Sequence, residues 1–181
     1  MGFLCEGLSL SLPHHTTTNL NFSIYEENAM SVRLGLDAKL FYCVAGIGGS
    51  PTWIELTNVK NVTLSMTKGE ADVTTRANKG WKATAGTLKE ASIEFEMVWD
   101  TQDAGFKAIK DAYFDGTLIG IAAMDGPVSG ANSNGSQGLW ADCMITDFSR
   151  DEPLEEALSV KVTAKPTYST NAPTWKTIGT A

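Results

Sequence analysis

Alternation of apolar and polar residues is the strongest signal along this chain, and it predicts β-strands. From Thr87 to Trp99, apolar side chains at every second position alternate with mostly polar ones. A period of two places the two sets on opposite faces of a strand, so one face is expected to be buried. Shorter patterns of this kind predict strands over residues 38–45, 53–56, 58–66, 117–124, 139–148 and 158–164.

The segment after the longest strand has a helical period instead. Phe106, Ile109 and Tyr113 are spaced so that they share one side of a helix. Asp100 or Thr101 is expected to cap the first turn, because a short polar side chain accepts a hydrogen bond from a free backbone N–H there. The sequence therefore predicts one amphipathic helix that packs on the strands.

Together these elements predict a mainly β fold, an antiparallel β-sandwich or split barrel with one packed α-helix. Two packed sheets, or a partly closed barrel, would bury the apolar faces. The β domain is expected to span residues 31–165, followed by a loosely held C-terminal tail, residues 166–181. Residues 1–30 are expected to form an N-terminal arm, either flexible or not native, because Met30 is a natural start.

A long polar segment, residues 67–85, is expected to be a loop between two strands. Loops longer than about 12–15 residues are uncommon inside compact domains and are usually functional or disordered. Trp81 is expected either to anchor this loop on its own domain or to contact a neighbour, and each charge either pairs with a partner or is simply exposed. The candidates for contact with a partner are Lys68, Glu70, Asp72, Arg76, Lys79, Trp81 and Lys82.

Charge and composition limit the classes of partner. The 181 residues carry a formal net charge of −7, and 43% of them are apolar, as in a globular domain. An acidic balance argues against a surface that grips nucleic acid, because such binding rests on basic contacts to phosphates. No apolar run approaches the roughly 18 residues of a membrane-spanning helix.

The three cysteines are an odd count without CxxC spacing. Free thiols are therefore expected, with a Cys43–Cys143 disulfide as the alternative. The only two histidines, His14 and His15, have no third ligand at metal spacing. No metal site is predicted, and no histidine is placed to activate a cysteine.

Two further motifs are candidates for chemistry. The glycine-rich segment 46–49 leads into another strand, whereas a phosphate-binding loop needs a helix directly after its glycines. A hairpin turn is therefore predicted there. Glu94 and Glu96 share one face of a strand and have a spacing that a glycosidase pair could use, but a solvated face or the wall of a ring-shaped oligomer also accounts for them. No catalytic or cofactor-binding residue is predicted.

The element order and two local phrases carry a family resemblance. The phrases are Asp72-Val-Thr-Thr-Arg-Ala-Asn-Lys-Gly-Trp81 and Ala91-Ser-Ile-Glu-Phe-Glu-Met-Val-Trp-Asp100. With the order strand, long loop, strand, helix and strands, the chain resembles major tail tube proteins of long-tailed (siphovirus-like) phages. The same superfamily includes type VI secretion tubes. The resemblance covers roughly residues 31–163, so residues 1–29 fall outside it.

This resemblance implies a structural subunit and no enzyme or cofactor. It implies that copies of the chain, encoded by a phage or prophage, assemble into stacked hexameric rings whose lumen conducts DNA without specific binding. Residues 67–85 are then expected to reach an adjacent subunit, and Glu94 and Glu96 to face the lumen. A tape measure protein, a tail terminator and a tail initiator complex are the expected partners, with no membrane.

The resemblance also implies a location and two alternatives. The protein is expected in the virion tail, and in the host bacterial cytoplasm during assembly. One alternative is a tube subunit of a type VI secretion or contractile injection system. The other is a carbohydrate-active β-sandwich that uses the two glutamates.

Overall fold

The computed structural model of the chain describes residues 32–130 and 133–179. Tertiary contacts divide the chain into two units, Met1–Val32 and Arg33–Ala181, and the β fold belongs to the second. The predicted N-terminal arm, residues 1–30, lies outside the described residues, and so do His14, His15 and Cys5.

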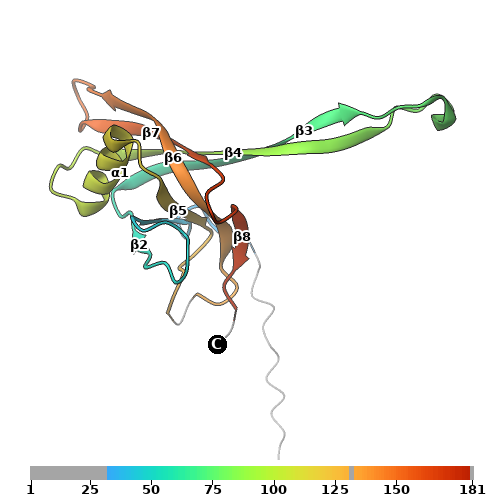
Figure 1. The fold of residues 1–181 in the computed structure, drawn as a ribbon. Helices are drawn as coiled ribbons and strands as arrows, with labels where there is room; N and C mark the ends of the chain where they lie inside the picture. Colours follow the sequence, from blue (N-terminus) through green and yellow to red (C-terminus); the bar gives the residue numbers. More distant parts are fainter. Residues whose placement is uncertain (1–31, 131–132, 180–181) are drawn as a thin grey trace, which may run out of the picture. The chain divides into compact units, whose positions relative to one another are not determined.

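The second unit is built on one eight-stranded antiparallel sheet (Figure 1). The strands follow the order β2-β1-β5-β6-β7-β4-β3, and β8 pairs with β6 beside this path. The edge strands β2 and β3 do not pair with each other, so the sheet is open. The mainly β, antiparallel prediction is confirmed. The strands are β1 (Lys39–Cys43), β2 (Ile54–Glu55), β3 (Val59–Asp72), β4 (Thr84–Val98), β5 (Ile119–Met124), β6 (Gln137–Asp151), β7 (Ser159–Pro166) and β8 (Thr174–Thr177).

The main core lies on one face of this sheet, beneath the helix α1 (Ala104–Asp115). The alternation that predicted β4 holds, because Ile93, Phe95 and Met97 are buried while the residues between them are less so. Val160 and Val162 on β7 pair with Met97 and Phe95 and are equally buried. The period of two therefore identified the buried face correctly.

The helix begins later than expected. Asp103 is its N-cap, and its carboxylate accepts a hydrogen bond from the backbone N–H of Phe106 at 2.7 Å. The prediction of Asp100 or Thr101 as the cap is wrong. Asp100 instead accepts from the N–H of Gln102 at 2.8 Å, which forms a separate turn before the helix. Both aspartates suit a cap, and the turn decides which one fills the position.

The predicted helical stripe packs as expected at two of its three positions. Phe106 and Ile109 are buried, whereas Tyr113 is 37% exposed and stacks on Phe148 with ring centroids 5.8 Å apart. Gly116 ends the helix with a φ of 63°, a left-handed conformation that glycine adopts without a steric cost.

The loop predicted over residues 67–85 is shorter in the structure, because residues 67–72 and 84–85 belong to the strands of a β-hairpin. β3 and β4 pair from Val59 opposite Met97 out to Asp72 opposite Thr84, and only residues 73–83 lie outside the strands. Both faces of the outer hairpin are largely exposed. A strand that is polar on both faces has no apolar alternation, so the period of two could not reveal it.

The predicted loose tail, residues 166–181, also contains structure. β8 pairs with β6, with Trp175 opposite Leu139, and the Trp175 Nε1 donates to Gln137 Oε1 at 3.1 Å. Ser169 donates to the buried carboxylate of Asp142 at 2.5 Å. These long-range bonds hold the segment between Pro166 and Thr177 on the sheet, and no local pattern announces them.

Cys43 and Cys143 are buried free thiols, as expected, and they do not form the alternative disulfide. Burial raises the pKa of the Cys143 thiol well above its ordinary range, with Asp142 as a second cause. Both cysteines act as small apolar residues in the sheet.

Candidate assembly surface

The outer half of the β3–β4 hairpin leaves the sheet as a two-stranded ribbon. β4 pairs with β7 only over Ile93–Val98, and Thr84–Ser92 pairs with β3 alone. At about 3.3 Å per residue, this stretch reaches roughly 30 Å beyond its last contact with β7. Figure 1 shows it projecting from the other strands. An isolated two-stranded hairpin is marginally stable in water, so the ribbon is suited to packing on another surface.

The tip of the hairpin is nevertheless ordered. Thr75 donates from both its N–H and its hydroxyl to the Asn78 side-chain oxygen, at 2.8 and 2.7 Å. These bonds frame the short 3₁₀ helix η1 (Arg76–Asn78). Asp72 accepts from the N–H of Thr74 at 2.8 Å, and hydrogen bonding by Thr74 lowers the pKa of the Asp72 carboxyl. The tip therefore presents its side chains from a defined turn.

The structure places every candidate contact residue of this region on an exposed surface. Trp81 is 81% exposed, which excludes the alternative that it anchors the segment on its own domain. Arg76, Lys79 and Lys82 make no ion pair within residues 32–130 and 133–179, and the tip 73–83 has no acidic residue. The remaining candidates, Lys68, Glu70 and Asp72, lie on β3.

Glu94 and Glu96 lie on the face of the sheet that is turned away from the main core. Glu94 stands opposite Thr163, and Glu96 opposite Lys161. Hydrogen bonding from Ser159 is the main cause that lowers the pKa of Glu96, with smaller contributions from Asn61 and nearby lysines. A glycosidase acid needs a raised pKa, so this environment does not suit that role.

The same face continues onto β6 with a mixture of charges. Asp147 stands opposite Thr163, and Asp151 opposite Ser159, in the β6–β7 register. Lys161 donates to Asp151 at 3.2 Å, and Lys165 approaches Glu90 at 3.5 Å. Each of these ion pairs is exposed and contributes little to stability. This part of the surface is therefore polar and charged, and its side chains pair with one another.

The glycine-rich segment 46–49 is a turn, as predicted. Gly46 donates its N–H to the Cys43 carbonyl at 3.1 Å, and the N–H of Ile47 donates to the Asp142 carboxylate at 2.8 Å. A carboxylate of the protein therefore occupies the amide that an anion would need. Among the described residues there is no cluster of three or more potential metal ligands, and no helix has the length and apolarity to cross a membrane.

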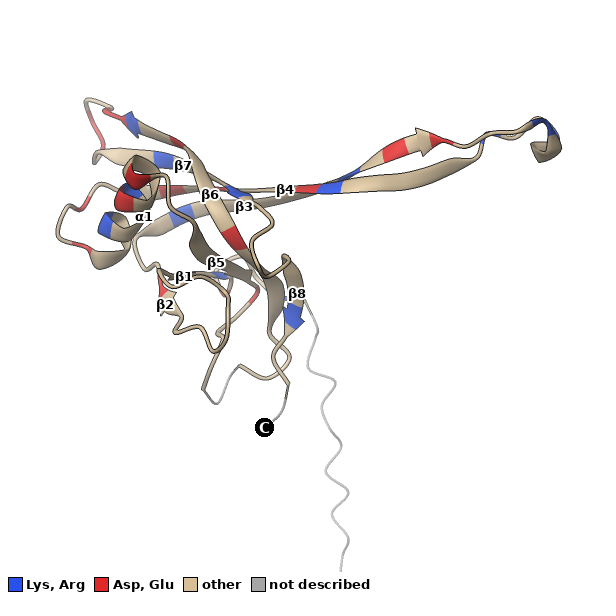
Figure 2. Cartoon of the chain, in the orientation of Figure 1, with Lys and Arg blue, Asp and Glu red and all other residues tan. Residues whose placement is uncertain are grey.

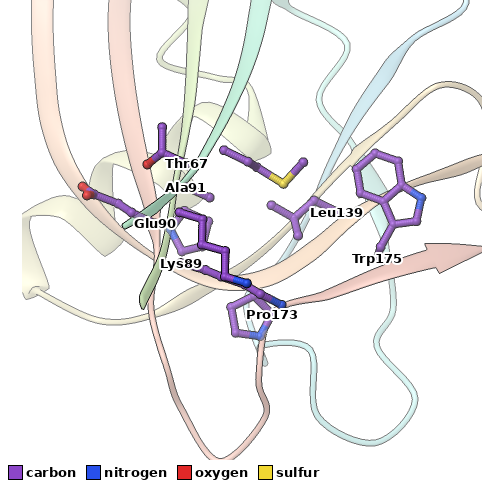
Figure 3. A pocket seen from close by; sticks show the side chains of 10 residues that line it. Thr67, Lys89, Glu90, Ala91, Leu139, Pro173 and Trp175 are labelled. Atoms are coloured by element: carbon purple, nitrogen blue, oxygen red, sulfur yellow. The ribbon is translucent and has the colours of Figure 1, made fainter. Parts of the chain in front are cut away.

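The sequence analysis missed one surface, a groove of about 440 Å³ where the ribbon leaves the sheet (Figure 3). Met66 and Ala91 line it from the ribbon, Leu139 lies at its floor, and Pro173 and Trp175 come from the C-terminal segment. Trp175 in a polar tail was the only sequence signal for it. The other lining residues become neighbours only through sheet pairing.

A family model described as phage tail tube protein matches residues 38–167. The chain belongs to the phage tail tube protein family. It is a structural subunit of a phage tail tube and part of the virion tail, not an enzyme, so the carbohydrate-active alternative is rejected. The family match also favours the phage tail over the secretion-system alternative. A search of curated proteins gives no match to the sequence.

Solved tail structures have the fold of this tail tube protein. One match is the tail of an empty gene transfer agent particle, computed with helical refinement and C6 symmetry. The matching chain is 17% identical to this one, with a TM-score of 0.61, and the match covers 80% of this chain and 99% of that chain. The virion of a native gene transfer agent particle has the same TM-score and coverage at 15% identity. The SPP1 tail tube is 17% identical with a TM-score of 0.59, over 82% of this chain and 80% of that one. Family and fold together support self-assembly of this chain into a tube.

Proposed function

We propose that this tail tube protein assembles into hexameric rings that stack into a tube, and that the lumen conducts DNA during ejection. The observation that carries the proposal is the ribbon over Thr84–Ser92, which pairs with nothing in the described part of the chain except β3. The neighbours of a tube subunit, within its ring and in the next ring, are other copies of the same chain. The C6 symmetry of the gene transfer agent tail supports six copies per ring.

The open sheet supports lateral assembly. β2 and β3 are edge strands, and β3 presents its unpaired backbone groups along the whole hairpin. Unpaired edges favour pairing with another chain, and closing a ring removes them. Repeated around a ring, this contact would join the sheets of neighbouring subunits.

We further propose that the face with Glu94 and Glu96 lines the lumen. Around the two glutamates this face is charged and polar, whereas the opposite face there is the core beneath α1. With a net charge of −7 per chain, the wall would repel phosphates and let DNA pass without specific binding. Residues of the ribbon tip, Arg76 and Trp81 foremost, would contact an adjacent subunit.

Other partners follow from the proposed role. A tape measure protein would set the tube length, an initiator complex would start growth and a terminator would stop it. Assembly would take place in the bacterial cytoplasm of the host before the tail joins the virion.

Electron microscopy of the concentrated full chain tests this proposal. Rings with sixfold symmetry, or tubes with a central channel, are the expected result. A chain that stays monomeric at all concentrations and salt conditions, even with the initiator complex added, would overturn it.

A shortened hairpin is the matched variant for the same experiment. Replacing residues 73–83 with Asn-Gly joins Asp72 and Thr84, which already stand opposite each other, by a two-residue turn suited to hairpins. The domain is expected to fold with unchanged circular dichroism, and tube growth to stop. Tubes of ordinary length from this variant would show that the tip is not an assembly contact.

A further inference from the structure

The core face of the β3–β4 hairpin changes from apolar to basic as it leaves the sheet. The pair nearest the sheet is buried on β4 and partly buried on β3. The next pair is more exposed, and the pair beyond it consists of two lysines. These pairs are Leu64 with Ile93, Met66 with Ala91, and Lys68 with Lys89.

The apolar part of this face forms one wall of the groove seen in Figure 3. Met66 is 55% exposed and Trp175 52% exposed, and the lining also includes the apolar Pro166 and Leu139 and the polar Thr67 and Glu90. Exposed apolar side chains gathered in one concave surface are typical of an interaction site. The groove is large enough for a single aliphatic side chain and its neighbours.

Lys68 and Lys89 line the same groove and repel each other. They are direct partners in the ladder, and like charges in this position destabilise a hairpin. Neither makes an ion pair within the described ranges, since nearby Glu90 pairs with Lys165. An anionic partner at the groove would relieve this repulsion.

The turn between β6 and β7 has the complementary character. Leu154, at its apex, is 100% exposed. Glu155 and Glu156 follow it and make no ion pair among the described residues, whereas Glu152 pairs with Arg150. Figure 2 shows acidic residues in this turn, and both acidic and basic residues along the ribbon. The turn thus presents an apolar side chain beside two unpaired carboxylates.

The groove and the turn lie at opposite ends of β7. The acidic turn leads into Ser159 at the start of the strand, and Pro166 at its end lines the groove. Copies that stack head to tail along this strand direction bring the turn of one copy to the groove of the next. Such a contact is heterologous and propagates as a filament.

We propose that the β6–β7 turn of a second copy docks in this groove, with Leu154 on Met66 and Trp175 and with Glu155 and Glu156 against Lys68 and Lys89. The inference rests on the proposed stacking of rings and names the surfaces that would join them. The ribbon tip is a poorer occupant because its charges have the same sign as the two lysines. A DNA phosphate would neutralise the lysines but leave the apolar groove unfilled.

Charge reversal tests the pairing. E155K/E156K and K68E/K89E should each raise the protein concentration needed for tubes at least about tenfold, because each puts like charges in contact. The two pairs combined restore the net charge of −7 and opposite signs across the contact, so assembly should return to near the wild-type concentration. Pelleting and electron microscopy measure both quantities, and circular dichroism checks that each variant is folded.

A matched control separates pairing from net charge. D111K/D115K on α1 changes the charge by the same amount at exposed carboxylates away from the groove. Combined with K68E/K89E it should not restore assembly. Restoration by this control, or no restoration by E155K/E156K, would overturn the inference and leave the proposed function standing. A wild-type chain that never assembles would overturn both.

A cross-link gives a readout that does not depend on charge. A photoreactive benzoylphenylalanine at position 154 should link one copy to a peptide containing Met66 or Trp175 of another, in tubes and not in monomers. Cross-links that map to other peptides of the chain, or to added DNA, would overturn the inference.

Discussion

Glu96 of β4 stands directly opposite Lys161 of β7, on the face of the sheet turned away from the helix. Its other register partner, across β3, is Lys60. Hydrogen bonding by Ser159 is the main cause that lowers the pKa of Glu96, and the two lysines add to it. In the proposed tube this acidic site would be held at the lumen wall by bonds within one subunit.

The lowered pKa of Glu96 predicts a pH-dependent contribution to stability. A carboxyl whose pKa falls on folding stabilises the folded chain above its ordinary pKa of 4.5, and this contribution is lost as the pH falls below that value. E96Q should therefore lower the free energy of unfolding at neutral pH, by no more than about 1 kcal/mol for a side chain that solvent still reaches, and leave it unchanged in acid. Urea unfolding of the monomer at both pH values measures this. E94Q is the control, and an equal loss in both variants would contradict the role of Ser159.

Trp81 is expected to matter for assembly and not for folding. Because it is 81% exposed, W81A should change the free energy of unfolding by no more than about 0.5 kcal/mol. Loss of an interface tryptophan should raise the concentration needed for tubes at least about tenfold. Y168A removes another exposed aromatic, 79% exposed, and should leave assembly unchanged. Equal effects of the two substitutions would show that Trp81 has no special contact.

Asp103 is expected to stabilise the helix as its cap. D103A removes the acceptor for the Phe106 N–H and should lower the free energy of unfolding by about 1 kcal/mol. T101A, at a position that sequence reasoning also offered as the cap, should stay within about 0.5 kcal/mol of wild type. Thermal unfolding of both variants compares them. A larger loss for T101A would place the helix start earlier than the structure does.

Gly138 is expected to be intolerant of a side chain. A Cβ atom at this position would clash with the Ala123 carbonyl oxygen of the paired strand β5. Because backbone must move to admit it, G138A should lower the free energy of unfolding by about 1–3 kcal/mol or more. G35A, where a Cβ meets nothing within 4 Å, should be neutral or slightly stabilising. Denaturant unfolding that shows equal stability for the two variants would contradict the close approach.

Sequence reasoning succeeded where the chain's local pattern coincides with burial. Ile93, Phe95 and Met97 alternate with polar residues, and β4 buries that face. It failed on the outer hairpin, which is polar on both faces, and on β8, which is short. In both cases the strand exists because a distant partner satisfies its backbone hydrogen bonds.

The candidate contact residues show the same division. Trp81 and Arg76 were identified from a polar segment of mixed charge, and their exposure in the structure leaves them available to a partner. The groove at Met66 and Trp175 was not identified, because more than a hundred residues separate its two sides. No single-sequence pattern reports which distant segments meet.

The sequence by itself determined the mainly β class, the single helix, the buried faces of the central strands and the resemblance to tail tube proteins. Each of these depends on residue spacing or on a short motif within a single segment of the chain. Only the tertiary structure decided that residues 67–72 and 84–85 extend the two strands as a ribbon and that Lys68 faces Lys89. It also placed the groove and the acidic turn at opposite ends of β7. These relationships depend on strand register, which long-range backbone pairing sets and local composition does not encode.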